Sequence, residues 1–165
     1  GLWRAFSKSL IHLRAIMSDT HDTIVDVIIA EHARLRSDFD NLDALPDDDR
    51  QGRKNLWKDL KKDLLAHHDA EEDTLFAALV QTTADARHES LHAVSEHGEH
   101  KKILEQMEDL SFDHDEWQAK LAELRHDVIH HLDEEEEDVL PIAREVLTKE
   151  KSRALAKAYS AAKDG

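Results

Sequence analysis

The sequence predicts an all-α protein, an antiparallel up-down-up-down four-helix bundle with extra helices at its N- and C-terminal ends. Ala, Leu, Glu, Lys, Asp and His dominate the 165 residues, a composition that favours helices. The 4 Gly and 2 Pro leave few positions for the turns of a sheet. Apolar residues also recur at helical spacing along four long segments joined by short loops, and such segments pack as antiparallel neighbours.

Four long segments and one shorter segment carry this helical pattern. In the first, the apolar stripe runs from Val25 to Leu42 with His32 in its middle, and Pro46 ends it together with the Asp residues that follow. The fourth segment is expected to break or kink near Leu140, because Pro141 lacks the N–H that a helix needs. The expected ranges are about 22–45, 52–80, 85–110, 113–140 and, for the short C-terminal helix, 149–162.

The start of the fourth helix carries several signals that agree with one another. Asp113 can accept hydrogen bonds from the first turn, and Glu116 follows three residues later. Phe112 is expected to pack against Trp117 across the same turn. The sequence therefore predicts a capped helix start at Asp113.

The chain divides into an amphipathic N-terminal extension, residues 1–16, and one helical domain, residues 17–165. The extension is basic and its apolar residues have roughly helical spacing, so a helix that binds a membrane surface or a partner is one interpretation. A helix packed on its own domain, or on a second copy in a homodimer, is favoured over it because amphipathicity is a weak membrane signal. Met17 resembles a natural start, which leaves a processed leader as a third interpretation.

Charge and composition argue against several classes of protein. With 37 Asp and Glu against 22 Lys and Arg, the formal net charge of −15 would repel phosphates, so no nucleic-acid partner is expected. The absence of Cys removes disulfides, thiolate metal sites and cysteine nucleophiles, and it is compatible with a reducing cytoplasm. No apolar run is long enough to span a bilayer, so a cytoplasmic protein is expected rather than a membrane protein.

Two motifs with the pattern His-x-x-x-Glu, His67–Glu71 and His131–Glu135, are the strongest indication of a functional site. Residues four apart share one face of a helix, so each motif aims an imidazole and a carboxylate in the same direction. Chance pairs are common in a chain with 13 His and 37 acidic residues, but both of these motifs fall on the apolar stripe of their helix. Burying such groups without partners is costly, and a bound metal ion is the simplest compensation.

In an up-down-up-down bundle, His32 and the His residues of the third helix reach the same level as the two motifs. Six or seven ligands from four helices fit a pair of metal ions better than a single ion, and mixed imidazole and carboxylate ligands favour iron, manganese or zinc over calcium or magnesium. No catalytic residue is expected outside the metal ligands, which makes a hydrolase improbable. The expected ligands are His32, His67, Glu71, His131 and Glu135, with His97, His100 or both.

The remaining His residues have no place in this set. His68 and His130 adjoin the two motifs and are expected to be solvated or to support the ligands, and Glu72 and Glu136 are candidates to hydrogen-bond to the ligands. The other six are expected on the surface: His12, His21, His88, His92, His114 and His126.

Over about residues 22–145, the order His, His-x-x-x-Glu, His, His-x-x-x-Glu resembles the hemerythrin-like HHE cation-binding family. The segments that carry the resemblance are IAEHARL, HHDAEEDTLF, SEHGEHKKIL and HHLDEEEEDVLP. Two features depart from the family pattern: Phe76 is followed by Ala77 rather than Pro, and His97 and His100 are three residues apart rather than four. Within the pattern, His97 is slightly favoured over His100 as the ligand from the third helix.

The resemblance implies a non-haem di-iron centre, with two iron ions favoured over manganese or zinc. It also implies a small ligand such as O₂, NO or peroxide, which the protein would bind, sense or break down. Whether the protein is an enzyme is left open, with catalase-like or small-oxidant redox activity as the enzymatic interpretation. Iron storage or homeostasis, or a metal-dependent interaction module, is the alternative.

Overall fold

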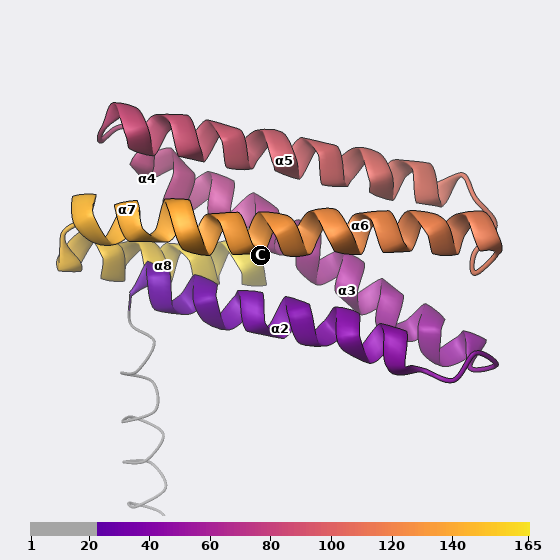
Figure 1. Ribbon diagram of the computed structural model, residues 1–165. Helices are drawn as coiled ribbons and strands as arrows, with labels where there is room; N and C mark the ends of the chain where they lie inside the picture. Colours follow the sequence, from indigo (N-terminus) through magenta and orange to yellow (C-terminus); the bar gives the residue numbers. More distant parts are fainter. Residues whose placement is uncertain (1–22) are drawn as a thin grey trace, which may run out of the picture.

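The computed structural model describes residues 23–165, and all the regular structure in that range is helical. Four long helical segments lie side by side, and a fifth helix packs along one end of them (Figure 1). The expected extension at residues 1–16 lies outside the described residues. The segments are α2 (Ile24–Ala44), α3 (Arg50–Glu71) continued by η2 (Glu72–Phe76) and α4 (Ala77–Leu79), α5 (Ala84–Glu108), α6 (Asp115–Glu134) continued by η3 (Glu135–Val139) and α7 (Leu140–Val146), and α8 (Lys149–Asp164).

Consecutive segments of the bundle run in opposite directions. The connections from α2 to α3 and from α5 to α6 lie at one end of the molecule, and those from α4 to α5 and from α7 to α8 lie at the other (Figure 1). The C-terminal helix α8 returns from that second end to pack against α2 and α3. The predicted all-α up-down-up-down bundle with a C-terminal helix is therefore confirmed for residues 23–165, while its division into domains stays a prediction.

Side-chain caps begin most of the long helices. Thr23, Asp49, Thr83 and Thr148 each accept a hydrogen bond from a backbone N–H in the first turn of the helix that follows. Such a cap stabilises a helix by about 1 kcal/mol, because it satisfies an N–H that has no partner inside the helix.

The cap expected at Asp113 is wrong. His114 occupies the cap position of α6 and makes no side-chain cap hydrogen bond. The Asp113 carboxylate instead accepts hydrogen bonds from Arg53 Nε at 2.6 Å and from Gln118, and the residue has a φ of 67°. An ion pair with α3 therefore takes the carboxylate away from the helix start. The predicted contact of Phe112 with Trp117 is confirmed, with ring centroids 4.7 Å apart.

Each long helix that carries a His-x-x-x-Glu motif changes to a π-helical turn at the end of that motif, as η2 and η3. Single π turns within α-helices occur frequently at functional sites. The second π turn also explains why the helix does not end near Leu140. Pro141 falls in the first positions of α7, where a missing N–H costs little, and the helix continues to Val146.

Two apolar clusters fill the interior, one on each side of a buried polar level. The first contains Ile28, Leu75 and Val139, and the second contains Leu35, Leu64 and Leu132 among others. Along each of the four long segments, the His and Glu residues of the two motifs and their partners lie where one cluster gives way to the other. None of the helices within residues 23–165 is long and apolar enough to cross a membrane.

Candidate metal centre

Six of the seven side chains expected to bind metal converge at this polar level. Each is at most 1 % exposed, so water is excluded from the level that they form. The six come from all four long segments: His32 from α2, His67 and Glu71 from α3, His97 from α5, and His131 and Glu135 from α6 and η3.

The Glu71 carboxylate reaches imidazoles on two sides of the bundle. Its Oε1 is in close contact with Nε2 of His67 and lies 3.6 Å from Nε2 of His32. Its Oε2 lies 3.4 Å from Nε2 of His97. Each oxygen of one carboxylate therefore faces a different imidazole group, which is the geometry of a bridging ligand.

The Glu135 carboxylate makes a matching pair of contacts from the opposite helix. Its Oε1 lies 3.6 Å from Nε2 of His32, and its Oε2 lies 3.1 Å from Nε2 of His131. Both carboxylates thus connect the His32 side of the centre with the side that contains His97 and His131.

The outward-facing nitrogens of these imidazoles have partners of their own. The Nδ1–H of His97 donates to Glu72 Oε1, and that of His131 donates to Glu96 Oε1, each at 3.0 Å. His67 Nδ1 is hydrogen-bonded to the Tyr159 hydroxyl at 2.6 Å. A hydrogen bond at Nδ1 fixes the tautomer and leaves Nε2 directed at the centre, as in protein metal sites generally.

His32 is held in a looser way. Its Nδ1 lies 3.8 Å from Glu136 Oε1, and Glu136 is in turn paired with Arg36. The expectation that Glu72 and Glu136 support ligands agrees with these contacts, although of these two residues only Glu72 lies within hydrogen-bond distance of an imidazole.

The donor set fits a pair of metal ions. Both oxygens of Glu71, both of Glu135 and Nε2 of His32 and of His67 are buried and make no hydrogen bond of normal geometry with any described residue. Buried polar atoms without partners cost about 1–3 kcal/mol each, so cations bound among them would stabilise this level of the core. Two groups of donors within ligand distance share Glu71: His32, His67 and Glu71, and Glu71, His97, His131 and Glu135.

Without metal, the carboxylates hold protons on the imidazoles around them. Burial lowers the pKa of His32, but the neighbouring Glu136, Glu71 and Glu135 carboxylates outweigh burial and raise the pKa to about 9. Burial likewise lowers the pKa of His97, while Glu71 and Glu72 raise it above its ordinary value. Protonated imidazoles therefore balance the two buried carboxylates until a metal ion replaces the protons.

The same balance holds on the side of the second motif. Burial lowers the pKa of His131, but the nearby Glu135 carboxylate and the hydrogen bond to Glu96 raise it to about 10. Burial raises the pKa of the Glu71 carboxyl, yet the nearby His67 and His32 bring it well below its ordinary range. Glu71 is therefore an anion at neutral pH, which is the state that binds a cation.

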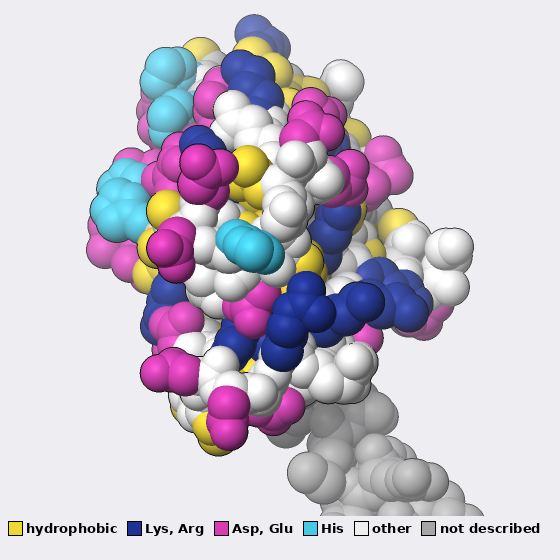
Figure 2. Space-filling model, turned by 90° about the vertical axis from the view of Figure 1, so that its right-hand side faces the viewer, with side chains coloured by type: hydrophobic (Ala, Val, Ile, Leu, Met, Phe, Trp, Pro, Cys, Tyr) yellow, Lys and Arg dark blue, Asp and Glu magenta, His cyan; other side chains and the backbone are white. Residues whose placement is uncertain are grey.

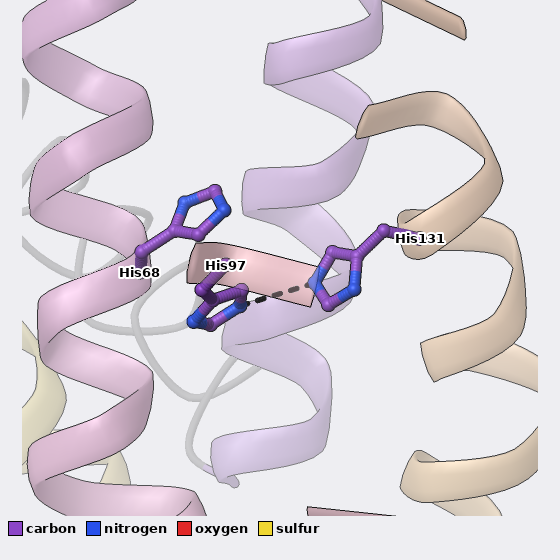
Figure 3. Close-up of side chains that lie close together, drawn as sticks. All are labelled: His68, His97 and His131. Carbon is purple, nitrogen blue, oxygen red and sulfur yellow. Dashed lines mark hydrogen bonds between the residues drawn. The ribbon is translucent and has the colours of Figure 1, made fainter. Parts of the chain in front are cut away.

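His100, the seventh expected ligand, does not face the two carboxylates. It is buried, and its Nδ1 lies 2.8 Å from Nε2 of His68. His68 is 1 % exposed, so the expectation that it is solvated is wrong. Its ring lies beside those of His97 and His131, and Figure 3 shows the three imidazoles together with the His97–His131 hydrogen bond of 3.1 Å.

The expected surface His residues within the described range are exposed, namely His88, His92, His114 and His126, and so is His130. His12 and His21 lie outside that range. His92 belongs to a third donor group with Glu96 and Glu134, which is partly exposed.

Two partners of the ligands were missed by sequence reasoning. Tyr159 follows the apolar stripe of α8, and nothing in its local sequence distinguishes a core residue from one that contacts His67. Glu96 directly precedes His97, but the two side chains diverge, and Glu96 contacts a His on the neighbouring helix. Only the pairing of the helices reveals these roles.

Fold and site together define a helical-bundle protein with a buried His and Glu centre able to hold metal ions. Residues 23–143 match the hemerythrin HHE cation binding domain, and the chain belongs to this family. A DNA nickase of Nostoc sp. is 29% identical over 171 residues, which cover 99% of this chain and 48% of the relative. The chain therefore spans about half the length of that relative. No solved structure matches the chain.

Proposed function

We propose that this protein binds two iron ions in the bundle core and uses them to bind or sense O₂ or NO, or to break down peroxide. The observation that carries the proposal is the pair of buried carboxylates, Glu71 and Glu135, each of which faces imidazoles on both sides of the centre. Two ions could share both carboxylates while the imidazoles bind at the outer sides. Membership of a cation-binding family supports the same reading.

Iron is favoured over zinc or manganese because the family resemblance implies a di-iron centre, while the donor set alone would suit all three. Bound iron would supply reversible binding or redox chemistry of small oxygen and nitrogen compounds. The protein contributes bridging anions, fixed imidazole tautomers and a core closed to water. Phe76 adds an apolar wall, since its ring centroid lies 5.7 Å from that of His97.

Metal analysis of the purified protein tests this proposal first. The expected result is two irons per chain and an absorption spectrum that disappears when the metal is removed. A content far above two irons per chain would favour iron storage instead. A protein that takes up no iron, manganese or zinc under any condition would contradict the proposal.

Turnover separates a carrier or sensor from an enzyme. Reversible spectral change on adding and removing O₂ or NO, without consumption of peroxide, supports binding or sensing. Sustained release of O₂ from peroxide at a fixed protein concentration supports a catalase-like enzyme. Glu71→Ala is the control, because loss of a bridging carboxylate should abolish either behaviour.

A second candidate function is the nicking of DNA, favoured by the similarity to the Nostoc DNA nickase over nearly all of this chain. The formal net charge of −15 counts against DNA binding. Figure 2 shows a band of Lys and Arg side chains on one end of the bundle, with other Lys and Arg side chains and many Asp and Glu side chains on the same face. Conversion of supercoiled plasmid to the open circle, lost in Glu71→Ala, would support nicking, and intact plasmid with divalent metal present would reject it.

A further inference from the structure

The two sides of the proposed metal pair are unequal in imidazoles. On one side stand His32 and His67, and on the other His97 and His131 form a group that His68 completes. If the metal pair of the proposed function is present, His68 is buried directly beside it.

His68 is placed by its own backbone. It follows His67 on α3, and its Nδ1–H donates to the carbonyl of Leu64 at 2.7 Å. A carbonyl can only accept, so the proton is on Nδ1 and the lone pair is on Nε2. The Nδ1–H groups of His97 and His131 are likewise directed at outer acceptors, which turns their Nε2 atoms inward, where the two lie 3.1 Å apart.

The ring of His68 also lies close enough to the rings of His97 and His131 to share an ion with them. Its centroid is 3.8 Å from that of His97 and 5.9 Å from that of His131, and one nitrogen from each of the three rings lies within 4.8 Å of the others. The three rings come from α3, α5 and α6, and Figure 3 shows His97 between His68 and His131. Three imidazole nitrogens at this spacing can reach a single ion.

Helix α5 does not supply a third imidazole to the His97 and His131 side. The side chain one helical turn after His97 belongs to Lys101, which pairs with Asp69 at the surface. His100 is rotated away from the carboxylates and contacts Nε2 of His68. The lone pair that His100 engages in the metal-free arrangement is the one that an ion would take.

We propose that His68 is a metal ligand, the third imidazole of the ion bound by His97 and His131, and that His100 is a positioning residue that holds the His68 ring until the ion binds. The ion on this side then has three imidazoles and shares Glu71 and Glu135. The ion on the His32 and His67 side has two imidazoles and shares the same carboxylates.

Proton NMR of the Co²⁺-loaded protein tests this directly. Paramagnetic Co²⁺ shifts the ring N–H protons of bound imidazoles far from other signals, and these protons disappear in D₂O. Five such signals are expected in the wild type, from His32, His67, His68, His97 and His131. Four signals with two Co²⁺ bound would overturn the role of His68 but leave the metal pair intact, whereas failure to bind Co²⁺ would overturn the pair itself.

Two variants assign the fifth signal. His68→Gln should leave four shifted signals and weaken the binding of one of the two Co²⁺ ions at least tenfold. His100→Gln should keep five shifted signals. Loss of the fifth signal in His100→Gln rather than in His68→Gln would overturn the assignment in favour of His100. If His68→Gln does not fold, the wild-type count together with five signals in His100→Gln still supports His68, and four signals there rejects it.

Discussion

The two His-x-x-x-Glu motifs have the same inner geometry and different surroundings. In each, the imidazole Nε2 and the carboxylate four residues later face the centre, and a π-helical turn follows. The outward nitrogen of His67 is held by Tyr159, a buried neutral hydroxyl from α8. That of His131 is held by Glu96, a partly exposed carboxylate from α5. The motif therefore determines what points inward, and the packing of other helices determines what supports it.

The difference has an electrostatic consequence. A carboxylate at Nδ1 makes the imidazole a stronger base and a stronger ligand than a hydroxyl does. Tyr159 stays neutral in this setting, because burial and then the nearby negative charge of Glu71 raise the pKa of its hydroxyl. Metal binding by the second motif should therefore depend more on the charge of Glu96, and metal binding by the first motif more on the packing of Tyr159 against His67.

The largest effect on metal binding is expected from the bridging carboxylates, where the two motifs should behave alike. Glu71→Ala and Glu135→Ala should each reduce metal content from two ions per chain to less than one, because both ions lose a shared ligand. Elemental analysis after dialysis measures this. Glu137→Ala, an acidic residue of the same run that is exposed, is the matched control and should keep both ions. Full metal content in both variants would refute the bridging role.

The next largest effect is expected on the stability of the metal-free protein, which should depend on pH. His32 and His131 have folded pKa values of about 9 and about 10, above the ordinary 6.5. A raised pKa stabilises the fold below pH 6.5, and this contribution is lost as the pH rises through 9 to 10. The melting temperature of the metal-free protein should therefore fall between pH 7 and pH 10. It should fall less in the metal-loaded protein, and an equal fall in both would count against these assignments.

A smaller effect on metal affinity should distinguish Glu96, the partner of His131, from Tyr159, the partner of His67. Glu96→Gln removes a charge from the second motif and should weaken metal binding by about 10–100-fold, the usual cost of losing such a partner. Tyr159→Phe removes only a hydrogen bond from the first motif. It should weaken binding less and lower the free energy of unfolding by about 1 kcal/mol. Metal titration and denaturant unfolding measure both, and a larger loss of affinity in Tyr159→Phe would reverse the comparison.

The smallest effect on metal is expected far from both motifs. Arg53→Ala breaks the pairing with Asp113 that joins α3 to the start of α6. The free energy of unfolding should fall by about 2 kcal/mol, since a largely buried charged hydrogen bond is lost. Metal content should stay at two ions per chain. Metal loss at a temperature where Arg53→Ala is still folded would show that the centre depends on the distant end of the bundle.

The bundle and the inner residues of the site could be predicted from the sequence because both depend on local periodicity. Apolar spacing places the helices, and the four-residue spacing of His67 with Glu71 places both side chains on one buried face. The structure brings together six of the seven expected ligands, all except His100. Whether these six residues bind metal stays a prediction.

What could not be predicted depends on contacts distant in sequence. Asp113 looked like a cap, but Arg53, sixty residues earlier, takes its carboxylate. Pro141 was expected to break or kink the helix, and the chain instead changes to a π turn just before Pro141 and stays helical to Val146. His68 was expected to be solvated or to support the ligands, and it is buried because His97 and His100 of α5 cover it. In each case tertiary packing outweighs the local signal.

Anomalous X-ray diffraction from crystals of the iron-loaded protein tests the central claim most directly. Two peaks at the iron absorption edge, about 3.5–4 Å apart as in two-metal centres generally, are expected between Glu71 and Glu135. A single peak there would contradict a metal pair. Peaks confined to the partly exposed group of His92, Glu96 and Glu134 would contradict the buried centre altogether.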